Sequence, residues 1–593
     1  MPFKPFTKLH LIVLLICIPV SRSMAQAKNE RLHQLFDKYN DATLRMAPVN
    51  ATAYGDPRFN DIMPNDISVP WLQEIHAYLR SYRDSLHTFD RQTLNPSDRI
   101  SYDVLDELLR HRLALEQFHL EYVPLGQLES MPLLFAQMGS GQSFQPFRTT
   151  KDYEDWNKRM IAFSAWLDTA IVNLQQGMLV GMMLPRTLAE KQIIQLHPLT
   201  LTDPDSCIFY KPLNNMPGTI SGHDKKRINR EYRKTINTIL APAYQRLVTF
   251  LKTTYLPATN NAAGVNVYPS GKAYYEEMVR FYTSDHYSPD SIYQLGLSEV
   301  DRITNAMEAI RTQTGFQGNL QAFFHFLRTD PQFMPYKTPE EVLTAFNNIN
   351  NKIQPHIAEL FSLTPKAGFE IRRSMTFMEA SMAVPSYMPP SQNGRPGLLY
   401  VPVPDATKIN VTFYGQEATF LHEAIPGHHF QIALQIENQQ LPLFRRFPSF
   451  SSYLEGWALY CESLGDLLGC YTDPYQKMGA LNNEIHRAIR LVTDVAIHTG
   501  RMTKEEAITY MLSHESVDTS TATKEIERYM TNPGQALSYM AGSITIQKLR
   551  EKYSRQQGNN FSLRKFHEAL LREGDMPLSV LEKYMDEWAA TIQ

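Results

Sequence analysis

The chain contains few cysteines for its length. Only four occur among its 593 residues, and one of them, Cys17, lies in an apolar segment near the N-terminus. The other three, Cys207, Cys461 and Cys470, are too few for a disulfide framework, and their spacing is unlike that of a thiolate metal site. A single disulfide among them is compatible with the sequence, and so are three free thiols.

A strong charge excess, a long hydrophobic run and an internal repeat are also missing. The formal net charge is -3, so nothing in the overall charge suggests a nucleic-acid partner. After the N-terminal segment, no stretch is apolar for long enough to cross a bilayer. Hydrophobic residues make up 43% of the chain, which is enough for the core of a large globular protein of one or two domains. Nothing in the sequence indicates an oligomeric state.

Residues 1–27 have the order of parts that is typical of an export signal. Two lysines are followed by the apolar run Leu11–Val20 and then by small residues at Ala25–Ala27. The bulky Ile16 before Cys17 argues against a lipoprotein site. The alternative, an ordinary buried N-terminal helix, does not account for this order. We therefore predict export to the periplasm or the cell exterior, with no integral membrane segment after signal removal.

The dominant period after the signal is helical. Apolar residues at Ile100, Val104, Leu108 and Leu109 fall on one face of a predicted helix. Two further helices are predicted to begin at Ser288-Pro289 and Thr338-Pro339, where a capping residue precedes proline. The first of these helices carries an apolar stripe at Ile292, Leu295, Val300, Ile303 and Met307.

One stretch has the alternating pattern of a β-strand. Residues 408–414 alternate apolar and polar side chains, and 398–403 is the expected partner in a hairpin. A strand edge beside a metal can bind an extended peptide through main-chain hydrogen bonds, although a hairpin that only packs is the simpler alternative. Residues 387–397 are expected to line the substrate cleft. We predict a mainly α fold with a small sheet, divided into helical regions at 28–285 and 286–593.

The stretch FLHEAIPGHHFQIAL, which begins at residue 420, resembles the zinc-peptidase pattern HExxH with altered spacing. In that pattern two histidines one turn apart bind zinc, and the glutamate is the general base. Here Pro426 stands where the second histidine belongs, and proline disturbs a helix. We predict a widened turn that returns His428 to His422, with Glu423 as the base. His429 is the alternative ligand; otherwise it lies beside the metal and supports it.

A third ligand is expected from the stretch SSYLEGWALYCESLG. A catalytic zinc needs three protein ligands and an open position for water. Glu455 is set among apolar residues, where a carboxylate is costly unless a metal balances its charge. The alternative is a solvated helix face with ordinary acids. The sequence therefore predicts one Zn²⁺ per chain, bound by His422, His428 and Glu455, with Glu462 supporting the site from two turns further on.

A polar stripe follows in EIHRAIRLVTDVAIHTG. His486, Arg490, Asp494 and His498 recur every four residues and so share one helix face. Asp494 is expected to orient a zinc-bound histidine. Arg490 or His498 is expected to hold a substrate carboxylate or an oxyanion. An internal ladder of ion pairs explains the same spacing equally well.

Several stretches resemble one bacterial family. They are YYEEMVRFYTSD, GLSEVDRI, YMPPSQNGRPG, FLHEAIPGHHFQ, YLEGWALYCESLG, HRAIRLVTDVAIH, RYMTNPGQALSYMAG and FHEALLREGDMPL. Over most of the chain the sequence resembles the "domain of unknown function 885" family. That family resembles gluzincin-type zinc peptidases, with zincin-like helical folds like those of oligoendopeptidases and relatives of angiotensin-converting enzyme. The resemblance points to His422, Glu423, His428 and Glu455, with His429 still open.

The resemblance also implies an oxyanion-binding tyrosine. Gluzincins use a late tyrosine or histidine for this role, which implies Tyr539 first and Tyr529 second; a tyrosine of the core is the alternative for each. We therefore expect an exported zinc metallopeptidase that acts on a peptide or small amide with Glu423 as general base. The alternatives are a zinc hydrolase of a cell-wall or lipid-linked amide and a non-catalytic peptide-binding protein.

Overall fold

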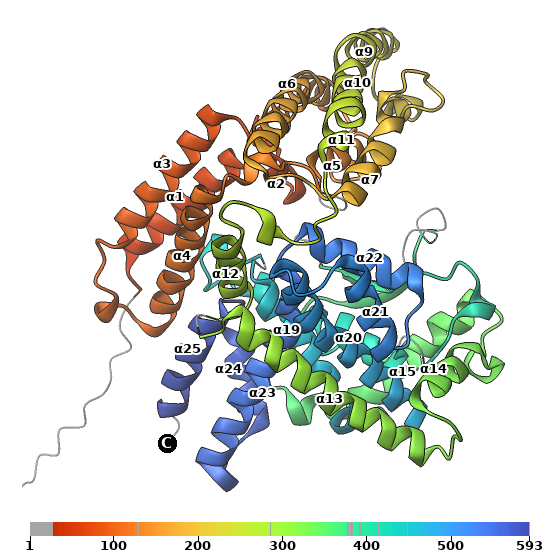
Figure 1. Cartoon of the computed structure of the whole chain (residues 1–593). Helices are drawn as coiled ribbons and strands as arrows, with labels where there is room; N and C mark the ends of the chain where they lie inside the picture. The colour runs from red at the N-terminus through yellow and green to blue at the C-terminus, as the bar shows by residue number, and fades with distance from the viewer. Residues whose placement is uncertain are drawn as a thin grey trace, which may run out of the picture.

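The computed structural model shows a mainly helical protein with one small sheet (Figure 1). It describes residues 28–126, 130–284, 286–375, 379, 384–390, 394–412, 415–447 and 449–591. The predicted export signal at residues 1–27 lies outside this range. The prediction of a mainly α fold is confirmed.

The N-terminal half is built from helices alone. They are α1 (Glu30–Met46), α2 (Pro48–Ala53), α3 (Val69–Leu86), α4 (Pro96–Leu115), α5 (Met131–Met138), α6 (Thr150–Val180), α7 (Arg186–Leu196), α8 (Lys211–Asn214), α9 (Gly222–Thr235), α10 (Ala241–Phe250), α11 (Leu256–Ala258) and α12 (Gly271–Tyr282). In Figure 1, α1, α3 and α4 lie on one side of the molecule, and α6, α9 and α10 stand above the green-to-blue body.

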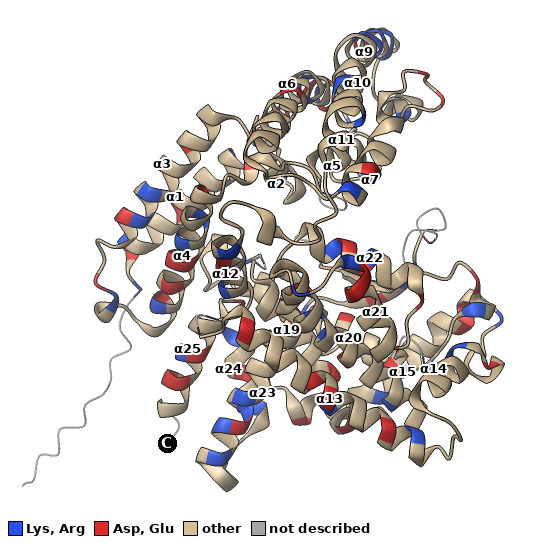
Figure 2. Ribbon diagram, viewed as in Figure 1, with Lys and Arg blue, Asp and Glu red and all other residues tan. Residues whose placement is uncertain are grey.

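The C-terminal half adds the sheet. Its helices are α13 (Pro289–Gln313), α14 (Leu320–Thr329), α15 (Pro339–Leu360), α17 (Gln416–Glu423), α18 (His428–Glu437), α19 (Ser451–Glu462), α20 (Pro474–His498), α21 (Lys504–His514), α22 (Thr519–Thr531), α23 (Ser538–Gln557), α24 (Leu563–Arg572) and α25 (Leu578–Thr591). Charges of both signs are mixed along the helices of both halves (Figure 2), in agreement with the small net charge.

The helix starts predicted from capping residues are confirmed. The Ser288 side chain accepts a hydrogen bond from the Ser291 N–H at the start of α13, and Thr338 accepts one from the Glu341 N–H at the start of α15. Four of the five residues in the predicted α13 stripe are buried, and Leu295 is partly buried. On α4, Ile100, Val104 and Leu109 are buried and Leu108 is partly buried.

The sheet differs from the predicted hairpin. Its strands are β1 (Phe369–Arg373), β2 (Ser386–Met388) and β3 (Gly397–Val401), in the order β1-β3-β2. β3 pairs parallel to β1 and antiparallel to β2. The strand predicted at 408–414 is wrong: Lys408 ends a 3₁₀ turn, and the Asn410 side chain accepts a hydrogen bond from the Thr412 N–H at 3.0 Å. This local side-chain bond outcompetes strand pairing; residues 413 and 414 lie outside the described range.

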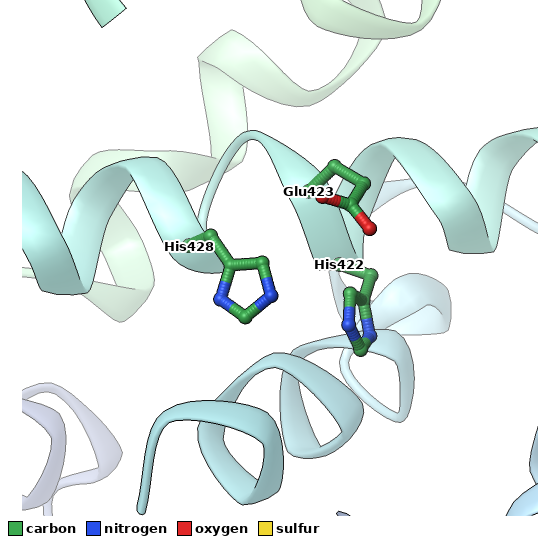
Figure 3. Close-up of side chains that lie close together, drawn as sticks. All are labelled: His422, Glu423 and His428. Carbon is green, nitrogen blue, oxygen red and sulfur yellow. The ribbon is translucent and has the colours of Figure 1, made fainter. Parts of the chain in front are cut away.

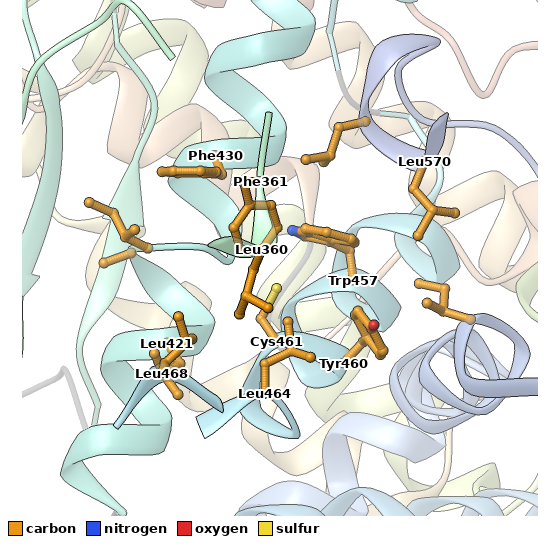
Figure 4. Close-up of a cluster of buried hydrophobic side chains, with 14 of the residues drawn as sticks. Leu360, Phe361, Leu421, Phe430, Trp457, Tyr460, Cys461, Leu464, Leu468 and Leu570 are labelled. Atoms are coloured by element: carbon orange, nitrogen blue, oxygen red, sulfur yellow. The ribbon is translucent and has the colours of Figure 1, made fainter. Parts of the chain in front are cut away.

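A continuous apolar cluster supports the short helices α17 and α18. Figure 4 shows its labelled members, which are Leu360, Phe361, Leu421, Phe430, Trp457, Tyr460, Cys461, Leu464, Leu468 and Leu570. Trp457 and Leu421 are fully buried, and each such side chain contributes about 1.5–3 kcal/mol by leaving water. This packing holds α17 and α18, the helices that carry His422 and His428, in place.

A second cluster joins the two predicted regions. It contains residues of α12, such as Tyr275, together with residues of α13, α20, α22 and α23. The proposed boundary at residue 285 stays a prediction. Cys207, Cys461 and Cys470 are buried and free. Among the described residues, no helix combines the length and the apolar character that crossing a bilayer requires.

Candidate metal centre

The HEAIPGHH segment forms two helices with a break between them. α17 ends at Glu423, α18 begins at His428, and the four residues between them are not helical. The Ile425–Pro426 peptide bond is cis. The His429 N–H donates to the Ala424 carbonyl at 3.1 Å, five residues earlier. The predicted widened turn inside one helix is therefore replaced by a break, because proline removes a donor and cannot continue the helix.

Gly427 makes the break compact. A Cβ at this position would lie 1.9 Å from the His422 carbonyl oxygen, so only glycine allows the chain to fold back over the end of α17. The Trp457 indole N–H of α19 donates to the Pro426 carbonyl at 3.0 Å and holds the turn in place. As a result, His428 lies beside His422, with their ring centroids 4.9 Å apart.

Two carboxylates meet this pair of imidazoles. Glu455 of α19 places its Oε2 3.4 Å from His422 Nε2 and 3.6 Å from His428 Nε2. Side-chain donor atoms of His422, Glu423 and His428 all lie within 4.8 Å of one another, as Figure 3 illustrates. The structure thus brings together the four residues that the sequence proposed for the metal and the base.

Glu462 fixes the orientation of one imidazole. Its Oε1 lies 2.8 Å from His422 Nδ1, which leaves Nε2 directed at Glu455. Burial lowers the pKa of His422, but the two carboxylates outweigh it and raise the pKa to about 9. Burial also raises the pKa of Glu455, yet His422 and His428 bring it well below its usual value. The carboxylates of Glu455 and Glu462 therefore favour a positive charge on the His422 ring between them.

The proposed base is held by the edge strand of the sheet. The backbone N–H of Tyr387 in β2 donates to Glu423 Oε2 at 3.1 Å. Because β2 lies at the edge of the three-stranded sheet, this N–H serves the glutamate instead of another strand. Tyr387 was expected to line the cleft with its side chain. Its main-chain role has no signature in a sequence, since every residue except proline carries an N–H.

His429 points into the sheet. Its Nδ1 lies 2.9 Å from the Tyr387 hydroxyl, and its ring lies 5.1 Å from that of Phe369. A Cβ at Gly397 would lie 2.6 Å from the same nitrogen, so the strand and the imidazole are in close contact. Burial lowers the pKa of His429 to about 4 and keeps the ring neutral. The alternative ligand therefore packs on the sheet, whereas His428 faces Glu455.

Tyr539 is placed beside the carboxylate ligand. α23 packs against α19 where two glycines meet: a Cβ on Gly456 would lie 2.5 Å from the Gly542 Cα. This close approach brings Tyr539 near Glu455. Burial raises the pKa of Tyr539, and the charge of Glu455 raises it further. The phenol is therefore protonated at neutral pH and able to donate a hydrogen bond.

Tyr529 is closed off from the site. It is fully buried, and its hydroxyl donates a hydrogen bond to Glu525 Oε2 at 2.9 Å. The Tyr529 hydroxyl oxygen also accepts a hydrogen bond from Arg490 Nε at 3.1 Å. A hydroxyl engaged in this way supports Arg490. The oxyanion role of Tyr529, the second choice, stays a prediction.

Two members of the α20 stripe have internal roles. Asp494 accepts hydrogen bonds from the Tyr275 hydroxyl at 2.6 Å and the Gly534 N–H at 3.1 Å; its predicted role of orienting a histidine of the site stays a prediction. His498 lies with Nδ1 3.3 Å from the Val265 N–H and Nε2 3.0 Å from a backbone carbonyl. Both of its ring nitrogens are engaged by backbone groups, and the substrate-binding role proposed for His498 stays a prediction.

Arg490 is the member of the stripe that reaches the site. Its guanidinium carbon lies 4.4 Å from the centroid of the Tyr539 ring. One terminal nitrogen, NH2, lies 3.1 Å from His486 Nε2 and 3.2 Å from Glu525 Oε2. Ion pairs of the kind offered as the alternative are present along α20, and the substrate-binding role of Arg490 stays a prediction.

The family model described as "Bacterial protein of unknown function (DUF885)" matches residues 48–585. The chain belongs to the DUF885 family. A "putative lipoprotein" from Colwellia psychrerythraea is 24% identical, with a TM-score of 0.86 over 95% of this chain and 99% of that one. A "putative lipoprotein of unknown function" from Shewanella oneidensis is 18% identical, with a TM-score of 0.74 over 94% and 99%. Both share the DUF885 fold. A search of curated proteins finds no match.

Sequence reasoning did not single out Arg487, whose charge lowers the pKa of Tyr539. Arg487 lies three residues before Arg490 on α20 and is close enough to Tyr539 to affect its charge. The spacing i, i+3 places both arginines on neighbouring positions of one helix face. That spacing was a usable signal, but the stripe was read only at intervals of four.

Proposed function

We propose that this DUF885 protein is an exported, zinc-dependent metallopeptidase with a zincin-like site. One observation carries the proposal: His422 Nε2 and His428 Nε2 lie 3.4 and 3.6 Å from the same oxygen of Glu455. Two donors that are each 2.0–2.1 Å from a tetrahedral zinc ion are about 3.3 Å apart. The His422–Glu462 hydrogen bond, at 2.8 Å, is distinctly shorter than either separation.

The residues also fit zinc in kind. Two imidazoles and one carboxylate form a common donor set of zinc hydrolases, and a carboxylate on the far nitrogen of a ligating histidine is the usual support. Glu462 supplies that support to His422. The Nδ1 of His428 is buried and has no partner among the described residues, which leaves its ring free to turn toward an ion.

In such a site zinc lowers the pKa of a bound water and polarises the substrate carbonyl. Glu423, aimed by the Tyr387 N–H, accepts a proton from the attacking water and passes it to the leaving amine. The Tyr539 hydroxyl donates a hydrogen bond to the oxygen of the carbonyl as it gains charge. Each of these groups belongs to a different element, namely α17, β2 and α23.

Two further observations support the location and the substrate. The signal-like residues 1–27 and the lipoprotein names of both structural relatives favour export. The site is built for amide hydrolysis, and an exported chain meets peptides as the most abundant amides. We therefore infer a peptide or small amide substrate.

The test combines metal analysis with substrate profiling. Protein lacking residues 1–27 should bind about one zinc per chain, and a peptide library read by mass spectrometry should show cleavage that a chelator abolishes reversibly. Glu423→Gln should keep the metal and lose about 10²–10⁴-fold in rate. Glu551→Gln, at an exposed position of α23, is the control and should behave like the unchanged protein.

Other outcomes would reject parts of the proposal. Hydrolysis of cell-wall or lipid-linked amides without peptide cleavage would replace the substrate class. Peptide binding without metal-dependent cleavage would make the protein a binding protein. Parallel loss of zinc and activity in Glu423→Gln would make Glu423 a ligand and not the base.

A further inference from the structure

The guanidinium group of Arg490 lies over the Tyr539 ring, 4.4 Å from its centroid, and two further arginines lie near enough to lower the pKa of Tyr539. Arg487 and Arg490 come from α20, and Arg528 comes from α22, where both basic and acidic residues are coloured along the ribbon (Figure 2). Burial and Glu455 raise the pKa of Tyr539, while the three positive charges oppose that rise. The cluster therefore lies close to the proposed oxyanion donor and to the metal site beyond it.

Two of the arginines have buried N–H groups without acceptors. Arg490 is 7% exposed, and its Nε and NH2 are engaged by Tyr529, His486 and Glu525. Its NH1 is buried and meets no acceptor among the described residues. The same holds for Arg487 Nε. A buried cationic donor without a partner is costly, so an acceptor supplied by a ligand would stabilise both arginines.

The cluster also contains more cations than acids. Glu525 Oε2 lies 3.2 Å from Arg490 and 3.0 Å from Arg528. Within the part of the chain that the structure describes, no carboxylate forms an ion pair with Arg487. Burial raises the pKa of Glu525, but the arginines bring it well below its usual value, so Glu525 stays ionised. An additional anion would balance the remaining charge.

We propose that Arg487 and Arg490, beside Tyr539, bind a carboxylate of the peptide substrate. This inference rests on the proposed peptidase function. The two oxygens of a carboxylate accept charge-assisted hydrogen bonds from guanidinium groups. Within the described part of the chain, Arg487 Nε and Arg490 NH1 are unpartnered donors that the two arginines have to offer. Every unmodified peptide carries such a group at its C-terminus, and Asp or Glu side chains are the second source. If the C-terminus is bound, cleavage occurs at a fixed short distance from it and releases short C-terminal fragments.

Matched peptides test the proposal on the zinc-loaded protein. One series has a free C-terminal acid, the second has the same sequences as C-terminal amides, and the third is amidated with Asp or Glu next to the cleaved bond. Amidation of neutral peptides should lower kcat/KM about 30-fold or more, as expected for removing one partner of a buried charge pair. Recovery in the third series identifies a side-chain carboxylate as the source. Equal cleavage of acids and neutral amides would overturn the proposal.

Substitutions in the protein complete a double-mutant cycle. Arg490→Gln and Arg487→Gln should lower kcat/KM for the free acid, mainly through KM, and should have little further effect on the amide. Arg230→Gln, at an exposed position of α9, is the control. A loss in kcat that is equal for acid and amide would place Arg490 at the oxyanion and contradict carboxylate binding. Zinc content of each variant shows that the site is still folded.

A binding measurement separates this proposal from the peptidase function. Calorimetry with the Glu423→Gln chain compares the affinity for an acid peptide and for its amide without turnover. Tighter binding of the acid that Arg490→Gln and Arg487→Gln both abolish supports the carboxylate site, even if no peptide is hydrolysed. Equal binding of acid and amide by a chain that does cleave peptides rejects the carboxylate site alone.

Discussion

Replacing Gly427 with alanine should disrupt the metal centre without touching a ligand. The added Cβ would lie 1.9 Å from the His422 carbonyl oxygen, whereas such atoms do not approach closer than 3.0 Å. Because the obstacle is backbone, the ends of α17 and α18 must separate by about 1 Å, several times the ~0.2 Å tolerance of a metal–ligand distance. His422 and His428 then no longer meet Glu455 at the observed spacing. We expect zinc affinity to fall by at least about 100-fold.

The assay is a competitive zinc titration against a chelator, with thermal unfolding recorded in the metal-free state. Overpacking of this kind costs about 1–3 kcal/mol, so the metal-free variant should melt lower but remain folded. Gly222→Ala is the control, because a Cβ there meets nothing within 4 Å. Unchanged zinc affinity in Gly427→Ala would refute the reasoning, since it would show that the break does not set the distance between the two histidines.

Three further outcomes are expected. His428→Ala should lose most of its zinc, whereas His429→Ala should retain it; the reverse result in a metal titration would assign the ligand to the other histidine. Glu462→Gln should weaken zinc binding roughly 10–100-fold, as expected for an outer-shell carboxylate, and atomic absorption after dialysis against graded chelator would detect it. In the metal-free protein the pKa of His422 is raised to about 9. Its protonation therefore stabilises the fold fully below the unfolded value of about 6.5 and ceases to do so as pH rises through about 9. Zinc must displace that proton, so its apparent affinity should rise roughly tenfold per pH unit up to about 9 and then level off; a flat titration between pH 7 and 9 would contradict the coupling.

Helix starts and the site residues on helices were accessible from sequence because their signals are local. Ser288 and Thr338 cap α13 and α15 as predicted. The closely spaced His and Glu residues from His422 onward indicated a candidate metal site from residue type alone. The strand at 408–414 was wrong because a side-chain hydrogen bond of Asn410 decides its conformation, and alternation carries no information about that bond. The family, by contrast, follows from motifs spread over most of the chain.

The roles along α20 were not accessible for a different reason. Arg490, Asp494 and His498 are equivalent in spacing, yet their contacts differ: Arg490 donates to the Tyr529 hydroxyl, and His498 lies against the Tyr529 carbonyl. Asp494 is engaged by Tyr275 of α12, some 220 residues earlier, and such a contact leaves no trace in a single sequence. Only tertiary packing separates the residue at the site from the two that hold the core together.

The contact of Glu455 and Glu462 with the two nitrogens of one imidazole has a mechanical consequence. Both carboxylates project from α19, two turns apart, so one helix contacts both ring nitrogens of His422. The close contact between Gly456 and Gly542 packs α23, which carries Tyr539, against the same helix α19. The spacing between Glu455, Glu462 and Tyr539 is therefore set by the packing of two helices, α19 and α23. His422 and Glu423 are neighbours on α17, so the same two contacts also limit how far the proposed base can move relative to α19.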